Sequence, residues 1–576
     1  MARYARHFAA LLAPHAGLTV EAIASAIGAP PRPELGQLAF GCFPLAASRR
    51  LSPAAIAAEI AAAARAALPP GDVIASVSAE GPYVNATLRG AEVARDVLPA
   101  VLAAGGRYGT LDLGAGGKVP VDFSSPNIAK PFAIHHLRST VIGNALVHML
   151  AAAGYQPVGI NHLGDWGTQF GQLLAIWELR GDEAELRRRG IGYLLELYVD
   201  FNARKAADPG LQDVARARFK ALEDGEPEAR RLWKLFRDVS VAEFGRVYAL
   251  LGIRFDDLRG ESFYEDRMPA VLDELAARGL LKESEDATVV DLSAWKLGAA
   301  LVRKRDGTTL YLTRDLAAAQ YRRDTYGFVR ALYVVGAAQA LHFAQLKQVL
   351  VLLGRDWEPR VEHVPFGLMR FKDRKMATRT GDILLLEEVL DRAVALARQT
   401  IERGAAEKGR PLPADLDTLA RQIGTGAVVF NDLKNRRARD VVFDWNEVLS
   451  FEGETGPYLQ YTAARIASMA ERLGRPARAD VDFALLDAPD ELALVLAIEA
   501  LPDALARGVA EAEPSHVSDR LLDIAARFSH LYSRKDWKVL SDDGALSDAR
   551  MLLAVATRQA LANGLSWLGI AVPERM

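Results

Sequence analysis

The amino-acid sequence predicts an α/β fold joined to an all-α region, with a small α/β module at the N-terminus. From Lys118 to about Gly354, candidate strands alternate with helical segments, which is the pattern of a parallel sheet covered by helices. After Leu384 the strand signals stop, and nearly every later segment has helical periodicity. We therefore predict three domains, at residues 1–110, 111–384 and 385–576.

The composition is that of an ordinary soluble globular protein. The chain has 576 residues, of which 50% are hydrophobic and 25% are charged. The net charge of −3 gives no overall basic field, although a local basic face could still bind nucleic acid. The single Cys42 excludes an internal disulfide framework and a multi-cysteine zinc site, so we expect no structural metal.

Neither a membrane span nor a strong targeting signal is predicted. Ala-rich stretches such as residues 54–67 are broken by Glu59 and Arg65, which leaves no apolar run of spanning length. Two arginines in the first 15 residues indicate a transit peptide only weakly. We expect no membrane partner and a cytoplasmic protein.

The first 110 residues predict a module without obvious chemistry. The segment IAAEIAAAARAAL, at residues 56–68, has the composition of a helix. The segment VIASVSAEGPYVNATL, at residues 73–88, predicts two strands around the Gly81-Pro82 turn.

The middle of the chain predicts a ligand site at one edge of a sheet. Each candidate strand is followed by a polar cluster, in turn SSPN, GDWGTQFG, TRD and GAAQ, and ligands of parallel sheets bind at the carboxyl ends of the strands. The region from about 180 to 252 is charge-rich and predicts an inserted, solvated helical layer. The candidate strands are Val119–Phe123, Val158–Leu163, Leu310–Thr313 and Ala331–Val335.

The stretch from Lys118 to Leu150 predicts a strand, a polar loop and a long helix that starts near Ala133. The free N–H groups and the dipole at a helix start favour anions. Four basic residues lie around this start, namely Lys130, His135, His136 and Arg138. Taken alone, these residues fit either an anion site or an ordinary strand–helix unit with a basic surface.

The last 190 residues predict a helical bundle. The segments with the clearest helical periodicity are Asp417–Asn435, Gly456–Leu473, Asp490–Ala506, Val517–Tyr532 and Ala549–Leu568.

Together, nine motifs in order resemble the class I arginyl-tRNA synthetases. They include SSPNIAKPF…HLRSTVIGN, NHLGDWGTQFG, RGESFYED, VRKRDGTTLYLTRDLAAA, YVVGAAQALHFAQL, KMATRTGD, FNDLKNRRARDVVFDW, LSFEGETGPYLQYTAARI and the terminal VPERM. The resemblance covers residues 120 to 576 and, less sharply, the first hundred. It implies a Rossmann-like class I catalytic domain, an additional N-terminal domain that grips the tRNA elbow, and a helical anticodon-binding domain.

The resemblance implies a two-step reaction. The carboxylate of L-arginine attacks the α-phosphate of ATP, which arrives with Mg²⁺, and arginyl-adenylate and pyrophosphate form. A ribose hydroxyl at the 3′ end of tRNA(Arg) then takes the acyl group. In this family the first step requires bound tRNA, and the enzymes are usually monomers. Phosphoryl chemistry of this kind needs positive charge and helix N–H groups more than a covalent catalyst.

The resemblance also implies an arginine pocket. A guanidinium has five fixed donors and suits carboxylate and amide acceptors, which these positions supply. Taken singly, each residue could equally be a capping Asp or a packing Tyr. The arginine-binding residues would be Asp122, Asn127, Tyr311, Asp315 and Gln339, with Tyr311 and Asp315 near one strand end. Pocket-wall residues would be Ser124, Asp165, Trp166, Gly167 and Gln169, with Gly167 allowing close backbone approach.

The ATP site departs from the family pattern. Relatives open the helix with His-x-Gly-His, whereas this chain has Ala133, Ile134, His135 and His136. Losing one polar phosphate contact costs roughly 1.5–3 kcal/mol, which is about 10- to 100-fold in rate. The imidazole of His135 would either intrude where adenine lies or turn toward the phosphates.

Four residues would be catalytic: Lys130, His136, Lys375 and Arg379. The last two belong to the family's Lys-Met-Ser-Thr-Arg loop, in which Ala377 replaces the Ser. Without the resemblance, a Gly-bounded stretch with Lys and Arg would be interpreted as a solvated surface turn. The residues of the ATP site would be Lys130, Ala133, His135, His136, Lys375 and Met376.

The bundle would contact tRNA through aromatic and basic side chains, because helical RNA modules stack on unpaired bases. A bundle-core tyrosine and a solvated arginine face are the ordinary alternatives. The candidates are Arg436, Arg437, Tyr458, Tyr461 and Arg465, with Trp537 as a further aromatic.

Two other functions stay open at this point. A paralogue with weakened ATP activation would use arginine or arginyl-tRNA for another acyl transfer. A catalytically silent regulator would only bind arginine or tRNA, but it would have little reason to keep Lys130, His136, Lys375 and Arg379.

Overall fold

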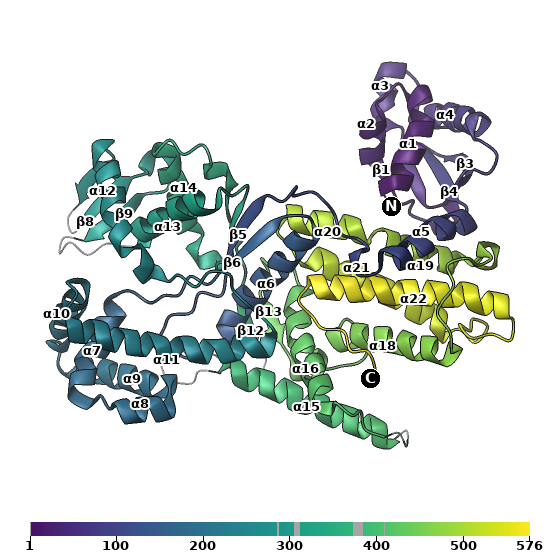
Figure 1. The fold of residues 1–576 in the computed structure, drawn as a ribbon. Helices are drawn as coiled ribbons and strands as arrows, with labels where there is room; N and C mark the ends of the chain where they lie inside the picture. The colour runs from purple at the N-terminus through teal and green to yellow at the C-terminus, as the bar shows by residue number, and fades with distance from the viewer. Residues whose placement is uncertain (1, 285–286, 305–310, 372–383, 408, 410) are drawn as a thin grey trace.

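The structure is a computed structural model in which a small N-terminal module, a central sheet and a helical bundle follow one another. Figure 1 shows the module standing apart at upper right, the parallel sheet at the centre and the bundle at lower right. The described residues are 2–284, 287–304, 311–371, 384–407, 409 and 411–576.

The N-terminal module is a four-stranded antiparallel sheet with helices. The strand order is β1-β2-β4-β3, and the predicted helix and the two strands around Gly81 are confirmed. The strands are β1 Ile27–Gly28, β2 Leu38–Gly41, β3 Ile74–Glu80 and β4 Tyr83–Leu88, and the helices are α1 Ala2–Ala16, α2 Val20–Ala26, α3 Ala46–Arg49 and α4 Pro53–Ala67.

Helix α5 (Gly90–Ala104) joins the module to the C-terminal helices. Beyond its end, the Asn563 amide donates to the carbonyls of Gly105 and Tyr108, at 2.9 Å each. The Tyr108 hydroxyl donates to the carbonyl of Ile498 at 3.2 Å. The segment after α5, residues 105–108, is thus hydrogen-bonded to the C-terminal helices.

The central sheet is parallel, with the strand order β11-β10-β5-β6. Alternate residues of β10 face different cores. Leu332 joins the core around α6, whereas Ala331 and Tyr333 join the core of α13 and α14, as the two-residue period of a strand requires. These elements are β5 Lys118–Asp122, β6 Gln156–Ile160, β10 Ala331–Tyr333, β11 Val361–His363, α6 Leu137–Ala152, α13 Tyr311–Tyr326 and α14 Ala340–Leu352.

Three of the four predicted central strands are confirmed, and the strand at Leu310–Thr313 is wrong. Tyr311 begins helix α13, and Leu312 and Leu316 pack one turn apart into the same core. A short apolar run does not distinguish a strand from a buried helix, and here the following RDLAAAQYRR continues the helix. The fourth strand is β11, which the sequence did not predict.

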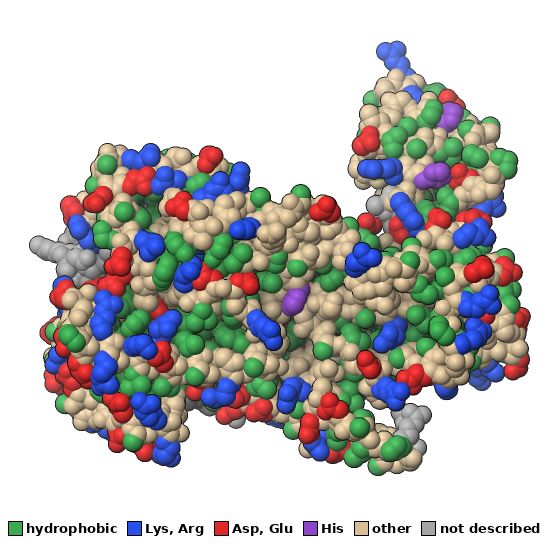
Figure 2. Space-filling view, viewed as in Figure 1, with side chains coloured by type: hydrophobic (Ala, Val, Ile, Leu, Met, Phe, Trp, Pro, Cys, Tyr) green, Lys and Arg blue, Asp and Glu red, His purple; other side chains and the backbone are tan. Residues whose placement is uncertain are grey.

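Helices α7–α11 form a layer beside the sheet. Figure 2 shows acidic and basic side chains interspersed over this layer, and ion pairs such as Arg188–Glu185 and Arg231–Glu183 account for part of the pattern. The helices are α7 Thr168–Arg180, α8 Glu183–Arg189, α9 Ile191–Ala207, α10 Leu211–Glu223 and α11 Pro227–Leu251. Next come α12 Met268–Ala277 and an antiparallel sheet of β7 Leu281–Ser284, β8 Ala287–Asp291 and β9 Ala299–Lys304.

The C-terminal region is helical, with two departures from prediction. Strand β13 (Val441–Phe443) pairs in parallel with β12 (Met369–Phe371), so strand structure does not stop at Leu384. The predicted helix 490–506 is two helices, because Pro502 lies in the first turn of the second. The helices are α15 Leu386–Glu407, α16 Leu416–Leu433, α17 Trp445–Val448, α18 Gly456–Leu473, α19 Pro489–Glu499, α20 Leu501–Ala510, α21 Ser515–Ser533 and α22 Gly544–Trp567.

In the described ranges, no single helix is long and apolar enough to cross a membrane. One bent pair, Arg3–Ala16 with Val20–Ala26 at 120°, satisfies length and composition together.

The contact between α6 and the sheet leaves no room for a side chain at Gly143. A Cβ there would lie 2.2 Å from Cβ and Cγ of Phe123, which follows β5. We expect Gly143→Ala to lower the free energy of unfolding by about 1–3 kcal/mol through overpacking. Gly245→Ala on α11, where no described atom lies within 4 Å, is the matched control. It should stabilise by about 0.5–1 kcal/mol. Equal effects in chemical denaturation would contradict the packing argument.

Candidate active site

Two polar loops meet at the carboxyl ends of β5 and β6. The Ile128 amide donates to the Gly164 carbonyl at 3.2 Å, and the Gly164 amide donates to the Pro126 carbonyl at 3.1 Å. A Cβ on Gly164 would lie 2.0 Å from Oδ1 of Asn127, so the glycine lets the loops close. Asn127 is thereby held, exposed, at the sheet edge.

Ser124 is a buried residue in the loop after β5. It has a positive φ of 54° and no exposed surface. Its amide donates to Oγ of Ser139 at 3.0 Å, and its hydroxyl lies 2.6 Å from that of Thr140 and 3.0 Å from that of Tyr248. Its side chain therefore shapes the loop from below, whereas we predicted a pocket wall.

Asp165 and Trp166, which we predict as pocket-wall residues, are also buried. The Asp165 carboxylate accepts from the amide and the hydroxyl of Ser262, both at 2.8 Å, and from Nε of Arg237 at 3.2 Å. The Trp166 ring packs edge-on against Trp233, at 5.9 Å between centroids. Both residues fix the position of the loop after β6.

Gly167 is required by its backbone conformation. Its φ is +139°, a region in which side chains are strained, and no atom of the described residues lies within 4 Å of a Cβ built there. That it permits close backbone approach stays a prediction. Gln169 follows on α7, half-buried.

The carboxylate of Asp122, at the end of β5, already has an internal cation. Nη2 of Arg322, from α13, lies 2.8 Å from its Oδ2, and both side chains are buried. The Ser125 hydroxyl donates to Oδ1 at 3.1 Å. Burial alone would lower the pKa of Arg322, but Asp122 holds that pKa well above its usual value. Sequence reasoning missed Arg322, although it lies seven residues after Asp315, on the same helix face.

Tyr311 and Asp315 lie one turn apart on α13, and not at a strand end. The carboxylate of Asp315 is 2.5 Å from Nε2 of His342, on α14. Burial would raise the pKa of Asp315, but the hydrogen bond and charge of His342, together with the charges of His162 and Arg322, lower it. Tyr311 is 64% exposed, and Gln339 is exposed just before α14.

Glu261 is a further titratable group that sequence reasoning did not single out, although it lies in the RGESFYED motif. Its carboxylate is 2.5 Å from Nη1 of Arg314. Burial raises the pKa of Glu261 to about 8; Arg314 opposes this shift, and Asp315 and Asp165 add to it. The nearby charge of Asp315 thus favours the protonated form of Glu261.

The start of α6 carries two neutral imidazoles and one ammonium group. The His136 ring stacks on Phe132 at 5.1 Å, and its Nδ1 lies 3.2 Å from the Ala133 amide. Burial, with the charge of His135, lowers the pKa of His136 to about 3. His135 is exposed by its surface area, but its ring is partly enclosed, 4.0 Å from that of His136. This partial burial, followed by the charge of Lys130, lowers the pKa of His135.

The Nζ atom of Lys130 lies 5.3 Å from the ring centroid of Tyr198, on α9. Burial lowers the pKa of Lys130. Ala133 is 2% exposed because its segment pairs with the chain at Leu385. The Ile134 amide donates to the Leu384 carbonyl at 3.0 Å. The predicted Lys375, Met376 and Arg379 lie outside the described residues.

The predicted tRNA contacts divide into buried and accessible groups. Arg437 is half-buried and donates to the carbonyls of Pro365 at 2.6 Å and Ala512 at 3.0 Å, so it links separate parts of the fold. Trp537 is buried, with its Nε1 donating to Glu491. The Tyr458 hydroxyl donates to Ser529 at 2.9 Å. In contrast, the half-buried Arg465 lies between Tyr461 and Tyr532, at 4.5 and 4.9 Å from their ring centroids.

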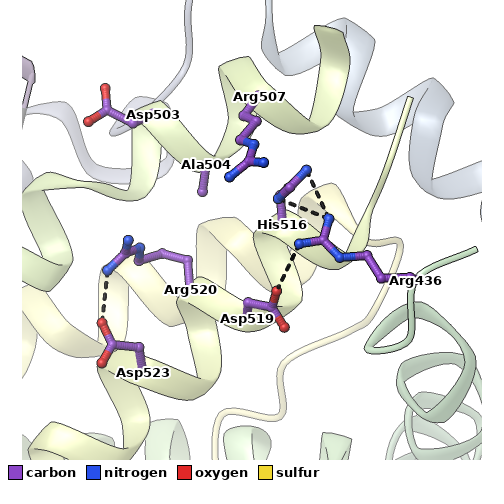
Figure 3. Close-up of a pocket in the computed structure, with 8 residues that line it drawn as sticks. All are labelled: Arg436, Asp503, Ala504, Arg507, His516, Asp519, Arg520 and Asp523. Carbon is purple, nitrogen blue, oxygen red and sulfur yellow. Dashed lines mark hydrogen bonds and ion pairs between the residues drawn. The ribbon is translucent and has the colours of Figure 1, made fainter. Parts of the chain in front are cut away.

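Arg436 lines a polar pocket of about 450 Å³ between α20 and α21 (Figure 3). Its guanidinium lies 3.0 Å from Nε2 of His516 and 3.9 Å from Asp519. Arg520 and Asp523 form an ion pair on the other side of the pocket. Among the described residues, no group of three or more His, Cys, Asp or Glu side chains is arranged to hold a metal ion.

Comparisons with known proteins point to the same family along nearly the whole chain. Family models match residues 2–88 (arginyl tRNA synthetase N terminal domain), 97–445 (tRNA synthetases class I (R), catalytic domain) and 459–576 (DALR anticodon binding domain). The arginine–tRNA ligase of Clostridium beijerinckii is 43% identical over 573 residues and all of both chains. That of Exiguobacterium sibiricum is 45% identical over 97% of both.

The fold agrees as well. The Thermus thermophilus arginyl-tRNA synthetase superposes with a TM-score of 0.79 at 24% identity, covering 96% of each chain. The family models and the full-length relatives confirm the resemblance drawn from the nine motifs. The chain belongs to the class I arginyl-tRNA synthetases, the family of the arginine–tRNA ligases.

Proposed function

We propose that this protein activates L-arginine with ATP and transfers the arginyl group to tRNA(Arg). The observation that carries the proposal is the meeting, at one sheet edge, of a carboxylate cluster and a cationic helix start. Asp122 ends β5 and is paired with Arg322 of α13, the helix that also carries Asp315, and Lys130 follows β5 in the loop that is hydrogen-bonded to the loop after β6. Full-length relatives that are arginine–tRNA ligases support it, and they disfavour the paralogue and regulator alternatives.

We assign the arginine guanidinium to Asp315, with Tyr311, Asn127 and Gln339 around the substrate. Asp122 is paired with Arg322, whose guanidinium keeps its charge at any physiological pH. The partner of Asp315 is His342, an imidazole that gives up its charge as pH rises. Asp315 can therefore exchange its internal partner for the substrate, whereas Asp122 orders Arg322 beside it.

We assign the phosphates of ATP to the start of α6, where Lys130 supplies the charge and His135 and His136 supply neutral imidazole donors. The arginine carboxylate oxygen forms a bond to the α-phosphorus, the α–β bridging bond breaks, and pyrophosphate takes the electron pair. Mg²⁺ enters as part of the ATP substrate. Lys375 and Arg379 complete the positive charge in this proposal.

For tRNA, the half-buried pair Tyr461 and Arg465 is the strongest of the predicted contacts, because it combines an aromatic ring with a guanidinium, the two side-chain groups on which unpaired bases stack. Arg436 and Tyr458 remain secondary candidates, and the N-terminal module would bind the tRNA elbow. A cytoplasmic monomer is the form that the family resemblance implies.

The deciding experiment is ATP–pyrophosphate exchange with arginine, measured with and without tRNA(Arg). We expect arginine-dependent exchange that requires tRNA. Measurable arginine binding without exchange at high enzyme concentration would overturn the ligase proposal and revive the regulator alternative.

The helix opening is tested by restoring the family motif. We expect Ala133→His combined with His135→Gly to raise the exchange rate and lower the KM for ATP, because the imidazole at position 135 leaves the adenine space and the one at 133 adds a phosphate contact. The gain should be about 10- to 100-fold. Loss of exchange in the double variant would show that His135 itself contacts the phosphates.

The pairing of Asp315 predicts a pH dependence of arginine binding. Burial would lower the pKa of His342, but its hydrogen bond and ion pair with Asp315 raise it above the ordinary value. Below that pKa the imidazolium competes with arginine for Asp315, so the KM for arginine should fall as pH rises through it. His342→Gln should flatten this profile, whereas His148→Gln on α6 should not. A native KM independent of pH between about 6 and 8 would contradict the assignment.

A further inference from the structure

A buried ion pair joins the start of α6 to the end of α16 across the boundary between sheet and bundle. Nε of Arg138 lies 2.8 Å from Oδ2 of Asp432, and both side chains are 1% exposed. Nη1 of the same guanidinium donates to the Arg439 carbonyl at 2.7 Å. Arg138 follows His136 by two residues, so the pair acts on the first turn of the helix that we assign to ATP.

On the sheet side, this first turn is held by hydrogen bonds. The Ser139 hydroxyl donates to the Val334 carbonyl at 2.7 Å, just after β10. The Thr140 hydroxyl donates to the His136 carbonyl at 2.7 Å. The helix start is thus fixed between the sheet on one side and Asp432 on the other.

On the bundle side, the turn after α16 also holds the strand that leads to residues 372–383. The Gly367 amide donates to the Arg437 carbonyl at 2.9 Å, and the Leu368 amide donates to Oδ1 of Asp440 at 2.8 Å. Strand β12 then pairs in parallel with β13, directly after this turn. Arg138 and residues 367–371 therefore both contact the end of α16 or the segment that follows it.

The pair is poorly suited to a purely stabilising role. Within the described part of the chain, Nη2 of Arg138 and Oδ1 of Asp432 have no hydrogen-bond partner. Burial raises the pKa of Asp432, although Arg138 opposes the shift. A buried pair with unsatisfied atoms is often no better for stability than apolar residues of similar volume. What it does impose is one relative position of α6 and α16.

We propose that Arg138 and Asp432 are positioning residues for amino-acid activation, which set the start of α6 from the helical bundle. This inference rests on the proposed function, because it assigns the ATP phosphates to that helix start. It goes further because it makes the rate of the reaction depend on two residues that do not contact the substrates. If tRNA binding moves the helical bundle, the movement would reach α6 through this pair.

The test compares Asp432→Asn and Arg138→Lys with the native enzyme in tRNA-dependent ATP–pyrophosphate exchange, equilibrium ATP binding and thermal unfolding. We expect kcat/KM for ATP to fall about tenfold or more, since displacements near 1 Å at a reacting centre cost up to about 100-fold. The ATP dissociation constant should rise several-fold, and the KM for arginine should stay within about twofold.

Glu362→Gln is the matched control. Arg330 pairs with Glu362 at 2.7 Å and donates to the Val509 carbonyl at 2.8 Å, so this ion pair also links sheet and bundle. It lies at the amino end of β10, at the opposite edge of the sheet from the site. Its loss should lower the melting temperature while kcat/KM for ATP stays unchanged.

A second variant separates positioning from stability. Arg138→Met with Asp432→Leu replaces the pair with apolar side chains and should keep or raise the melting temperature. If positioning is the role, its exchange activity stays low. Recovery of native activity in this folded variant, or an unchanged kcat/KM in Asp432→Asn, would overturn the proposal. Should the native enzyme show no exchange, the proposed function fails, and the change in ATP dissociation constant alone decides the positioning role.

Discussion

The site depends on the ion pair between Asp122 and Arg322. The carboxylate ends the central strand, and the guanidinium comes from α13 on the other side of the sheet edge. Because the pair is buried, its charges are poorly screened and their positions are fixed. Asp122 is thus paired internally with Arg322, whereas the partner of Asp315 is the imidazole of His342.

The two sides of the site carry different kinds of charged and polar groups. The side formed by α13 and α14 has Asp315, with Glu261 close enough to influence it. The side formed by the start of α6 has Lys130 and two imidazoles, of which the buried His136 is neutral because of its lowered pKa. In the proposed function, Asp315 binds the cationic amino acid and the start of α6 binds the anionic nucleotide.

Local patterns were sufficient for most of the fold. Strands β5, β6 and β10 and most of the C-terminal helices lie where hydrophobic periodicity predicts them. Periodicity failed at Tyr311–Thr313, where a short apolar run begins a buried helix, and at Val441–Phe443, a strand that exists because β12 provides its partner. For the site, the motifs lie in the loops after β5 and β6, and the structure buries Ser124, Asp165 and Trp166 within those loops, which local periodicity does not predict.

The sequence alone determined the family, the order of the motifs and the strand ends at which the polar residues gather, because these follow from local composition and spacing. Only the tertiary structure decided which partner each carboxylate has, which motif residues are buried and which contacts join the bundle to α6. Asp122 and Arg322 are 200 residues apart, and Arg138 and Asp432 are 294 apart. Charge pairing and desolvation arise from contacts of this kind, and local periodicity carries no information about them.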